Sequence, residues 1–340
     1  MSHLRQNHKL EQMLAKLICP DCRAEIVQSN SEWHCPKCGR KFPYLHGILS
    51  FLTDTEKFNE GEFEEKQKGA WSDSAALRQK ISQSRFLSFL NTLRIKFSFF
   101  GRRDRLFYNE MAHGDKSRLI LDLGCGGGRH YFCNYGRVVG VDPVLELLPM
   151  AKKLYAEVYH AGGYQLPFAD NTFDYVVSSD VLGHIPFDKK DVLFAEMHRV
   201  LKKGGRAVHV IETDSTNVWF REAKRIPGFF EKHFVDVPGH VGLELPTALR
   251  NRFLKHGFKE VRFKKLYSTL QPVGDIANIF KNDFDKHPAW IRLSVRVDGV
   301  LGKKFAVREA LHLLMEPLAI LDDALTPIDH GSGMLVVFEK

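Results

Sequence analysis

Four cysteines near the start of the chain form its clearest metal-binding pattern. They stand as two Cys-x-x-Cys pairs separated by twelve residues, Cys19 and Cys22, then Cys35 and Cys38. Each pair makes a tight turn that directs two thiolates toward one point, and a hairpin brings both pairs to one tetrahedral zinc. Four thiolates leave no open coordination position, so the predicted zinc is structural. Disulfides are the alternative, and the cytoplasmic location expected below disfavours them.

A glycine-rich loop in the middle of the chain offers a second kind of chemistry. Residues 118–142 read RLILDLGCGGGRHYFCNYGRVVGVD. The apolar runs Leu119–Leu123 and Val138–Val141 are typical of buried parallel strands, so we expect a strand, a loop, a helix and a second strand. Such a unit presents backbone N–H groups to a ligand and places the carboxylate of Asp142 for ribose hydroxyls.

The spacing of the glycines excludes a nicotinamide-dinucleotide site. A Gly-x-Gly-x-x-Gly pattern requires its third glycine where this chain has Arg129 or Tyr131. The pattern that remains, DLGCGGG at residues 122–128, resembles motif I of the class I S-adenosylmethionine-dependent methyltransferases, in particular their type 11 group.

Later segments repeat the order typical of that family. GVD at 140–142, LPFADNTFD at 166–174 and EMHRVLKKGG at 196–205 resemble its second-strand acid, the segment before strand four, and the helix and turn before strand five. Val176–Asp180 and Arg206–Ile211 would be strands four and five. The resemblance implies an α/β fold with a Rossmann-like seven-stranded sheet. We expect strand six at Phe258–Phe263 and strand seven at Gly333–Lys340, and the roughly seventy residues between them predict a helical insertion between strands six and seven.

The resemblance also implies how the cofactor S-adenosylmethionine is held. Asp122 would lie beneath the methionyl group, the glycines would let the backbone approach, and Asp142 would bind the ribose. The family commonly has an acid for the adenine where this chain has Gly162, so we expect the adjacent loop to hold the adenine. The predicted cofactor-binding residues are Asp122, Gly124, Cys125, Gly126, Gly128, Asp142, Gly163, Tyr164, Gln165 and Ser179.

The sulfonium of S-adenosylmethionine already makes the methyl group electrophilic, so the protein must mainly align a nucleophile for in-line displacement. A base is needed only if the nucleophile arrives protonated. The predicted catalytic groups are His184, Asp180 and Glu212, near the ends of strands four and five. His184 has a suitable pKa range, although a histidine here can also shape the loop and contact the cofactor.

The cysteine region resembles the Trm112-like zinc ribbons. The matching segments are ICPDC at 18–22, WHCPKCGRKFP at 33–43 and GILSFL at 47–52. Members of that family support methyltransferases, either as separate subunits or fused to the enzyme. A ribbon this small buries little apolar surface, so zinc would stabilise it.

The length of 340 residues exceeds one ordinary domain of about 100–200 residues. We predict a zinc ribbon over 1–52, a polar linker and amphipathic helical segment over 53–112, and a methyltransferase domain over 113–340. A helical cap is expected at about 266–331. Its two helices are expected around Ala289–Leu301 and Ala306–Ala324.

The segment Ser84–Met111 has apolar and aromatic residues near helical spacing, together with several arginines and a lysine. Such a helix could lie on an anionic membrane surface or stack on nucleic acid. We favour a third interpretation, in which it packs over the methyltransferase domain and closes the active site.

The net charge of +8, from 49 basic and 41 acidic residues, is compatible with an anionic partner. An anionic substrate would be favoured if basic residues gathered at one crevice. The basic residues that we single out for this are Arg94, Arg102, Arg103, Lys224 and Arg225.

No run of roughly 18 apolar residues predicts a transmembrane segment, and the amino terminus has no apolar signal region. We therefore expect a cytoplasmic protein, with peripheral membrane contact left open.

Three hypotheses concern the acceptor. A small-molecule or lipid-like acceptor is favoured by the aromatic cap. RNA, an rRNA or tRNA base, is the alternative, because the ribbon-plus-methyltransferase layout resembles the rRNA guanine-N1 methyltransferases, although their ribbon typically includes a histidine ligand. The third is a cofactor-binding scaffold without catalysis, motivated by Gly162.

Overall fold

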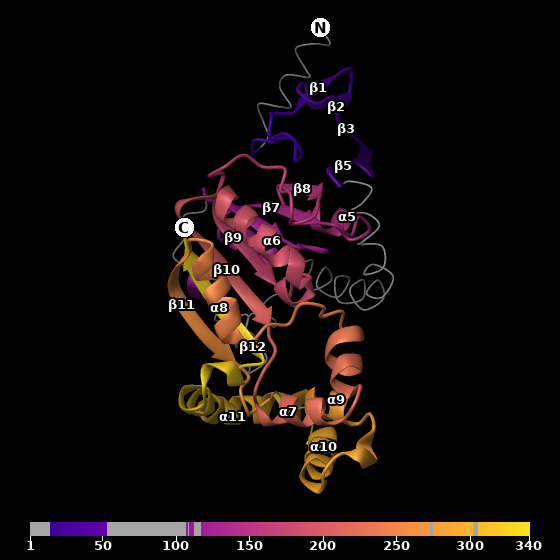
Figure 1. Cartoon of the computed structure of the whole chain (residues 1–340), viewed down its shortest axis with the longest axis vertical. Helices are drawn as coiled ribbons and strands as arrows, with labels where there is room; N and C mark the ends of the chain where they lie inside the picture. Colours follow the sequence, from indigo (N-terminus) through magenta and orange to yellow (C-terminus); the bar gives the residue numbers. More distant parts are fainter. Residues whose placement is uncertain (1–13, 53–106, 108, 112–116, 272–274, 302–304) are drawn as a thin grey trace.

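The computed structural model describes residues 14–52, 107, 109–111, 117–271, 275–301 and 305–340. A nine-stranded sheet forms its centre (Figure 1), with the order β11-β12-β10-β9-β6-β7-β8-β5-β4. The strands of this sheet are β4 (Tyr44–Leu45), β5 (Ile48–Ser50), β6 (Leu119–Leu123), β7 (Arg137–Asp142), β8 (Glu157–His160), β9 (Phe173–Ser179), β10 (Leu201–Glu212), β11 (Lys259–Leu266) and β12 (Gly333–Glu339).

Seven of these strands, from β11 to β8, confirm the predicted Rossmann-like sheet. β6 pairs in parallel with β7 and β9, and β9 with β10, whereas β12 runs antiparallel between β10 and β11. The carboxyl ends of β6, β7, β9 and β10 therefore meet at one edge of the sheet. A ligand crevice in an open parallel sheet forms at such an edge.

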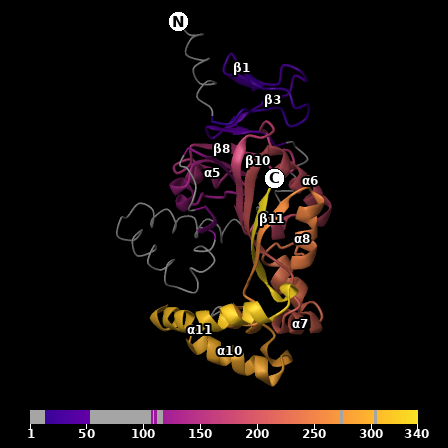
Figure 2. The ribbon, with the colours of Figure 1, turned by 90° about the vertical axis from the view of Figure 1, so that its left-hand side faces the viewer.

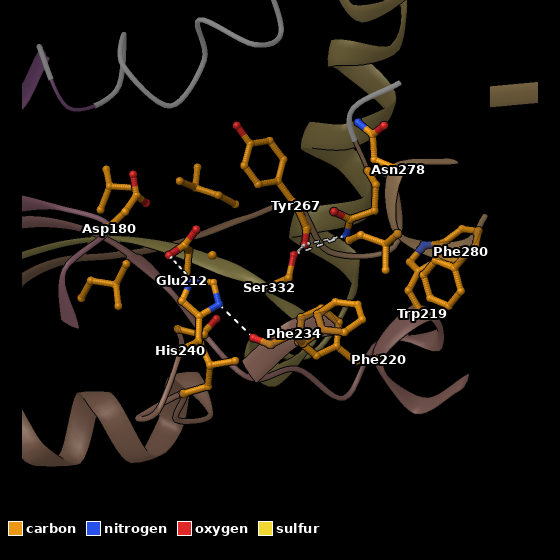
Figure 3. Close-up of a pocket in the computed structure, with 18 residues that line it drawn as sticks. Asp180, Glu212, Trp219, Phe220, Phe234, His240, Tyr267, Asn278, Phe280 and Ser332 are labelled. Atoms are coloured by element: carbon orange, nitrogen blue, oxygen red, sulfur yellow. Dashed lines mark hydrogen bonds and ion pairs between the residues drawn. The ribbon is translucent and has the colours of Figure 1, made fainter. Parts of the chain in front are cut away.

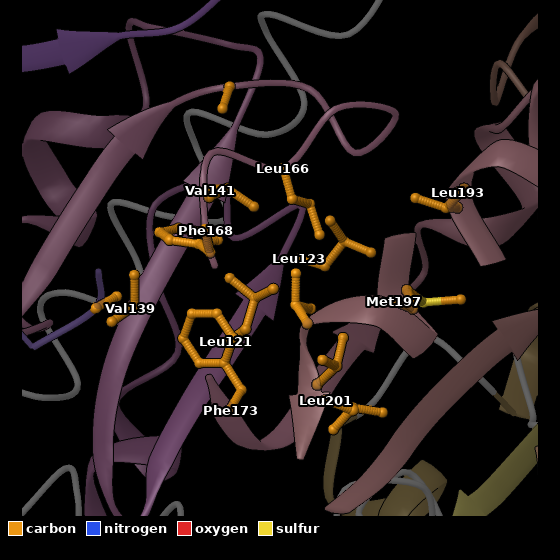
Figure 4. Close-up of a cluster of buried hydrophobic side chains, with 14 of the residues drawn as sticks. Leu121, Leu123, Val139, Val141, Leu166, Phe168, Phe173, Leu193, Met197 and Leu201 are labelled. Carbon is orange, nitrogen blue, oxygen red and sulfur yellow. The ribbon is translucent and has the colours of Figure 1, made fainter. Parts of the chain in front are cut away.

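Helices cover both faces of the sheet (Figure 2). The helices α6 (Phe187–Val200) and α8 (Pro246–Lys255) lie on one face, and α5 (Leu148–Ala151) on the other. Alternate residues of β6 face opposite sides, so Leu121 packs with Met197 of α6 in the cluster of Figure 4, while Ile120 packs toward α5. Burial of each such side chain contributes about 1.5–3 kcal/mol, and the two layers fix the positions of the strand ends.

The prediction of a helix between β6 and β7 is wrong. The connection contains a short 3-10 helix, His130–Asn134, in its place. Thirteen residues separate the two strands, and the first of them are mostly glycines, which have low helix propensity. The loop therefore presents backbone N–H groups without a following α-helix.

The ribbon lies beyond the β8 side of the sheet (Figure 1). The strands β1 (Val27–Ser29), β2 (Glu32–His34) and β3 (Lys41–Phe42) form a small antiparallel sheet of their own. β5 joins the large sheet instead, where Leu49 pairs in parallel with Tyr159 of β8. The sequence did not indicate this continuation of the sheet into the ribbon.

Side chains also tie the ribbon to the methyltransferase fold. The Arg23 guanidinium donates two hydrogen bonds to the Glu196 carboxylate, at 3.2 and 2.7 Å. Apolar residues of the ribbon, including Phe51, belong to the same buried cluster as Tyr159 and Phe168. The two parts therefore share one core.

The helices α7 (Val218–Arg225), α9 (Asp275–Phe280), α10 (Ala289–Leu301) and α11 (Phe305–Leu325) lie past the carboxyl ends of the parallel strands (Figures 1 and 2). α10 and α11 lie where the sequence predicts two helices of the insertion, and α9 was not predicted.

None of the helices in the described ranges combines the length and the apolar character that crossing a membrane requires. Nearly all of Ser84–Met111 lies outside the described residues.

Candidate active site

The glycine loop follows β6 directly and bends in a conformation that favours glycine. Gly124 has a φ of 68°, and a Cβ atom there would lie only 2.6 Å from Val181 Cγ2. The amides of Gly124 and Cys125 donate to the carbonyl oxygen of Val141 at 2.9 and 3.0 Å. Larger residues would push the loop away from the end of β9.

Asp142 ends β7 and holds the glycine loop. Its Oδ2 accepts a hydrogen bond from Gly126 N at 2.7 Å, and its Oδ1 accepts one from Val144 N at 2.8 Å. Burial raises the pKa of this carboxyl to about 6. A carboxylate has about four acceptor positions, so two remain for the hydroxyls of a ribose.

Asp122 is anchored by a tyrosine that the sequence analysis missed. Tyr155 Oη donates to Asp122 Oδ2 at 2.6 Å and accepts from Arg129 N at 2.6 Å. Burial raises the pKa of Tyr155 well above its usual range, so the phenol stays protonated and able to donate. Tyr155 connects the strand β6 to the far end of the glycine loop. Its position thirteen residues after Asp142 carried no recognisable signal.

The loop after β8 contains the residues predicted to hold the adenine. A Cβ atom on Gly163 would lie 2.5 Å from Leu193 Cδ1, so the chain passes close to α6 there. Next to Ala161 and Gly162, the His160 ring interacts with Ser50 Oγ of the ribbon at 2.9 Å and with the Pro143 carbonyl oxygen at 2.7 Å. Tyr164 is half-buried and Gln165 is exposed in this loop.

A cavity of about 370 Å³ lies beyond the ends of β9, β10 and β12 (Figure 3). Its size suits a small molecule, since such sites measure about 300–1,000 Å³. Within the described part of the chain, no lysine or arginine lines it. One end is polar, and the other is aromatic; the main side chains are Asp180, Glu212 and His240, then Trp219, Phe220, Phe234, Tyr267 and Phe280.

The structure brings the three predicted catalytic residues together. Asp180 and Glu212 line the cavity, and His184 Nε2 lies 4.0 Å from Glu212 Oε2. Asp180 adopts a left-handed backbone conformation, with a φ of 61°, and accepts a hydrogen bond from Ser179 Oγ at 3.2 Å. Such a conformation at a non-glycine residue is strained and is often found at functional sites.

His240 joins this group, and the sequence analysis missed it. Its Nε2 lies 2.8 Å from Glu212 Oε2, and its ring centroid lies 4.7 Å from that of His184 (Figure 3 shows His240 and Glu212). Burial alone would lower the pKa of His240, but the hydrogen bond to Glu212 raises it overall. Burial lowers the pKa of His184. His240 lies 28 residues after Glu212 in a loop without a motif, so only the fold reveals the cluster.

Of the five predicted basic residues, the two that the structure describes, Lys224 and Arg225, do not line the cavity. Lys224 pairs with Asp214 at 2.5 Å, and Arg225 pairs with Glu222 at 3.0 Å. The other three residues, Arg94, Arg102 and Arg103, lie outside the described ranges. The charges of Lys224 and Arg225 are therefore compensated by neighbouring acids.

The four cysteines of the ribbon converge as the spacing predicts. Cys19 Sγ lies 3.6 Å from Cys38 Sγ, and Cys22 Sγ lies 3.3 Å from Cys35 Sγ. Thiolates around a tetrahedral zinc stand about 3.8 Å apart, given zinc–sulfur bonds of about 2.3 Å. The cluster therefore fits a zinc ion with small adjustments.

Comparisons with known proteins agree with this arrangement. Residues 121–209 match the family described as Methyltransferase domain. A demethylmenaquinone methyltransferase of Oceanobacillus iheyensis is 32% identical over 173 residues, which cover 42% of this chain and 71% of that protein. The protein named "Probable tRNA methyltransferase 9B" of Bos taurus is 32% identical over 143 residues, covering 42% of this chain but 29% of that protein.

Solved structures with a similar fold share little sequence with this chain. Phosphoethanolamine N-methyltransferase 2 of Haemonchus contortus has a TM-score of 0.42 and 18% identity, and covers 70% of this chain and 51% of that one. A complex of the Trm112 methyltransferase activator of Haloferax volcanii with a methyltransferase has a TM-score of 0.43 and 15% identity. The match covers 71% of this chain and 92% of that one.

The sheet order and the family match define the class of this protein: it belongs to the class I S-adenosylmethionine-dependent methyltransferases. Within that class, residues 121–209 match the type 11 methyltransferase domain.

Proposed function

We propose that this methyltransferase transfers a methyl group from S-adenosylmethionine to a small-molecule or lipid-like acceptor that binds in the cavity. The observation that carries the proposal is the position of the cavity, which begins at the ends of β9 and β10. Asp180 lines it, and the next residue, Val181, packs against Gly124 of the glycine loop. Its aromatic end suits an apolar body, and its polar end suits the reacting group of the acceptor.

The residues of the glycine loop fit the cofactor. Gly124, Gly126 and Gly128 all have positive φ angles, which favour glycine, and as glycines they place no side chain between the loop backbone and a ligand. Asp142 would accept hydrogen bonds from the ribose, and Asp122, held by Tyr155, would lie near the methionyl group. Cys125, Ser179 and the loop Gly163 to Gln165 complete the proposed binding residues. S-adenosylmethionine, when bound there, supplies a methyl group activated by its sulfonium.

The polar end of the cavity would orient the acceptor. We propose that His184, Asp180 and Glu212 face its nucleophile and assist its deprotonation. Correct alignment is the larger contribution, because positioned groups can lower a barrier by several kcal/mol. The rigid ends of β9 and β10 provide that alignment.

Zinc in the four-cysteine cluster would have a structural role. The ribbon contributes β5 to the large sheet and Ser50 to the His160 contact beside the predicted adenine loop. We propose that zinc, by holding the ribbon, stabilises the edge of the cofactor site. A ribbon of this size depends on metal for its fold.

A labelling experiment tests the acceptor class. The purified chain is incubated with cell extract and methyl-labelled S-adenosylmethionine, and the label is sorted into RNA, protein, lipid and small-molecule fractions. We expect label in the lipid or small-molecule fraction, and much less of it with the Asp142→Asn variant at a cofactor concentration that half-saturates the unaltered chain. Label in RNA would favour the alternative, an RNA methyltransferase, which the tRNA methyltransferase relative supports. Cofactor binding without any transfer would favour a non-catalytic scaffold.

A further inference from the structure

Three side chains match the ligand set of a transition-metal site: Glu212 and His240 line the polar end of the cavity, and His184 lies next to Glu212. His184, Glu212 and His240 each offer one ligand atom, and these atoms lie within 4.8 Å of one another. Two imidazoles and one carboxylate are the ligands that ions such as manganese, iron, nickel and zinc bind in proteins. This site is separate from the four cysteines, which lie in the ribbon.

The two histidine rings are oriented as metal-binding histidines are. His184 Nδ1 lies 2.9 Å from the Gly239 carbonyl oxygen, and His240 Nδ1 lies 3.0 Å from that of Phe234. Because a carbonyl only accepts, each Nδ1 carries the proton and donates it. A metal-bound histidine typically makes this hydrogen bond through its other nitrogen, which fixes the tautomer and the ring. Both Nε2 atoms are thereby directed toward the Glu212 carboxylate.

The distances suit a metal after a small movement of Glu212. His240 Nε2 lies 2.8 Å and His184 Nε2 lies 4.0 Å from Glu212 Oε2. Ligands at about 2.1 Å from a tetrahedral ion stand about 3.4 Å apart, which falls between these two values. A rotation of the carboxylate toward His184 would equalise the distances.

Exposure distinguishes this site from a structural one. The side chains of His184 and His240 are 11% and 13% exposed, and that of Glu212 is 36% exposed toward the cavity. Three protein ligands leave coordination positions open, as in catalytic metal sites. An oxygen of the acceptor can therefore occupy an open position.

We propose that His184, Glu212 and His240 bind a divalent transition-metal ion that holds an acceptor hydroxyl for O-methylation. This inference rests on the proposed function. The metal acidifies the bound hydroxyl, whose proton leaves to solvent. An oxygen lone pair then forms the new oxygen–carbon bond, while the carbon–sulfur bond breaks and its electron pair stays on sulfur. His184 and Glu212 thus assist deprotonation through the metal.

Manganese(II) is the probe that tests the site. Because it prefers nitrogen and oxygen ligands over thiolates, the ribbon cysteines compete poorly for it. Titration of the full chain with its ribbon zinc in place, followed by electron paramagnetic resonance of free manganese, should show one additional ion per chain. His240→Gln and Glu212→Gln should each weaken binding at least about tenfold.

A matched control is available in His256, which lies 3.1 Å from the Asp191 carboxylate as another histidine–carboxylate pair outside the cavity. His256→Gln should bind manganese like the unaltered chain. Cofactor titration shows that each variant is folded. Equal manganese binding by His240→Gln and the unaltered chain, or no binding of manganese, cobalt or nickel at millimolar concentration, would overturn the proposal. Full methyl transfer by metal-stripped chain would overturn it as well, while leaving the proposed function intact.

Discussion

Asp142 is the residue on which cofactor binding should depend most directly. Replacing it with Asn removes the charge that would accept the ribose hydroxyls, while the side chain keeps its shape. Hydrogen bonds to a charged group contribute about 1.5–3 kcal/mol, so we expect the dissociation constant of S-adenosylmethionine to rise about 10- to 100-fold. Isothermal titration measures this. Asp188→Asn, at a side chain that is 72% exposed and pairs only loosely with Lys189, is the control; equal affinities of the two variants would contradict the role of Asp142.

The raised pKa of Asp142 also predicts a pH dependence. Burial raises this pKa to about 6, so the carboxyl is protonated below that pH and accepts hydrogen bonds poorly. Cofactor affinity should therefore fall as pH drops below about 6, by up to about tenfold per pH unit. The stability of the ligand-free chain should depend on pH in the opposite direction. Because the pKa of Asp142 is raised in the folded state, the protonated carboxyl stabilises the fold at low pH, and this stabilisation is lost as pH rises through 6.

Titrations between pH 5 and 8 check this dependence. The Asp142→Asn variant should lose most of it. The same slope in both proteins would assign the pH dependence to another group.

Individual residues differed in how far the sequence revealed them. Asp122, Asp142 and the glycines belong to one short contiguous pattern, which the strand order then places at one edge. Tyr155 and His240 reach the site from segments without a pattern, and their partners, Asp122 and Glu212, lie tens of residues away. Spacing along the chain carries no information on such contacts, because the fold alone creates them.

The strand β5 predicts how mutations in the ribbon affect the rest of the protein. Leu49 is 1% exposed and packs in the same core cluster as Leu121 and Phe168. Leu49→Ala should lower the free energy of unfolding by about 2–4 kcal/mol. Urea unfolding should show this shift in one transition for the whole chain. Leu314→Ala on α11, where the side chain is 72% exposed, should change little; a separate small transition for Leu49→Ala would indicate that the ribbon unfolds independently.

Elements with strong local patterns were predicted, and those set by distant contacts were not. β6 and α10 have the bounds that the apolar runs indicate. The helix after the glycine loop was predicted from the two apolar runs that flank it, and the structure has a short 3-10 helix there because the glycine-rich connection has low helix propensity. β5 is three residues long and pairs with β8 more than one hundred residues later, so no local pattern could show its partner.

Removing the zinc that we propose for the ribbon should affect the whole molecule, because the ribbon and the methyltransferase fold share a core. A strong chelator should lower the midpoint of thermal unfolding by several degrees, as expected for a loss of a few kcal/mol. Cofactor affinity should fall with it, because Ser50 contacts His160 beside the adenine loop. Cys35→Ser should mimic the chelator, and Cys133→Ser, outside the ribbon, should not. An unchanged midpoint after zinc loss would refute this coupling.

The pairing of β5 of the ribbon with β8 of the large sheet also affects the tendency of the protein to aggregate. Unpaired strand edges invite pairing with another chain, and proteins limit this with short or charged edge strands. Among the described strands, one edge of the large sheet is β4, only two residues long, and the other is β11, whose sequence KEVRFKKL is rich in charge. Without the ribbon, β8 would become an edge strand that presents Val158 and Tyr159. By covering β8, the ribbon should limit self-association, and a chain that lacks it should form oligomers.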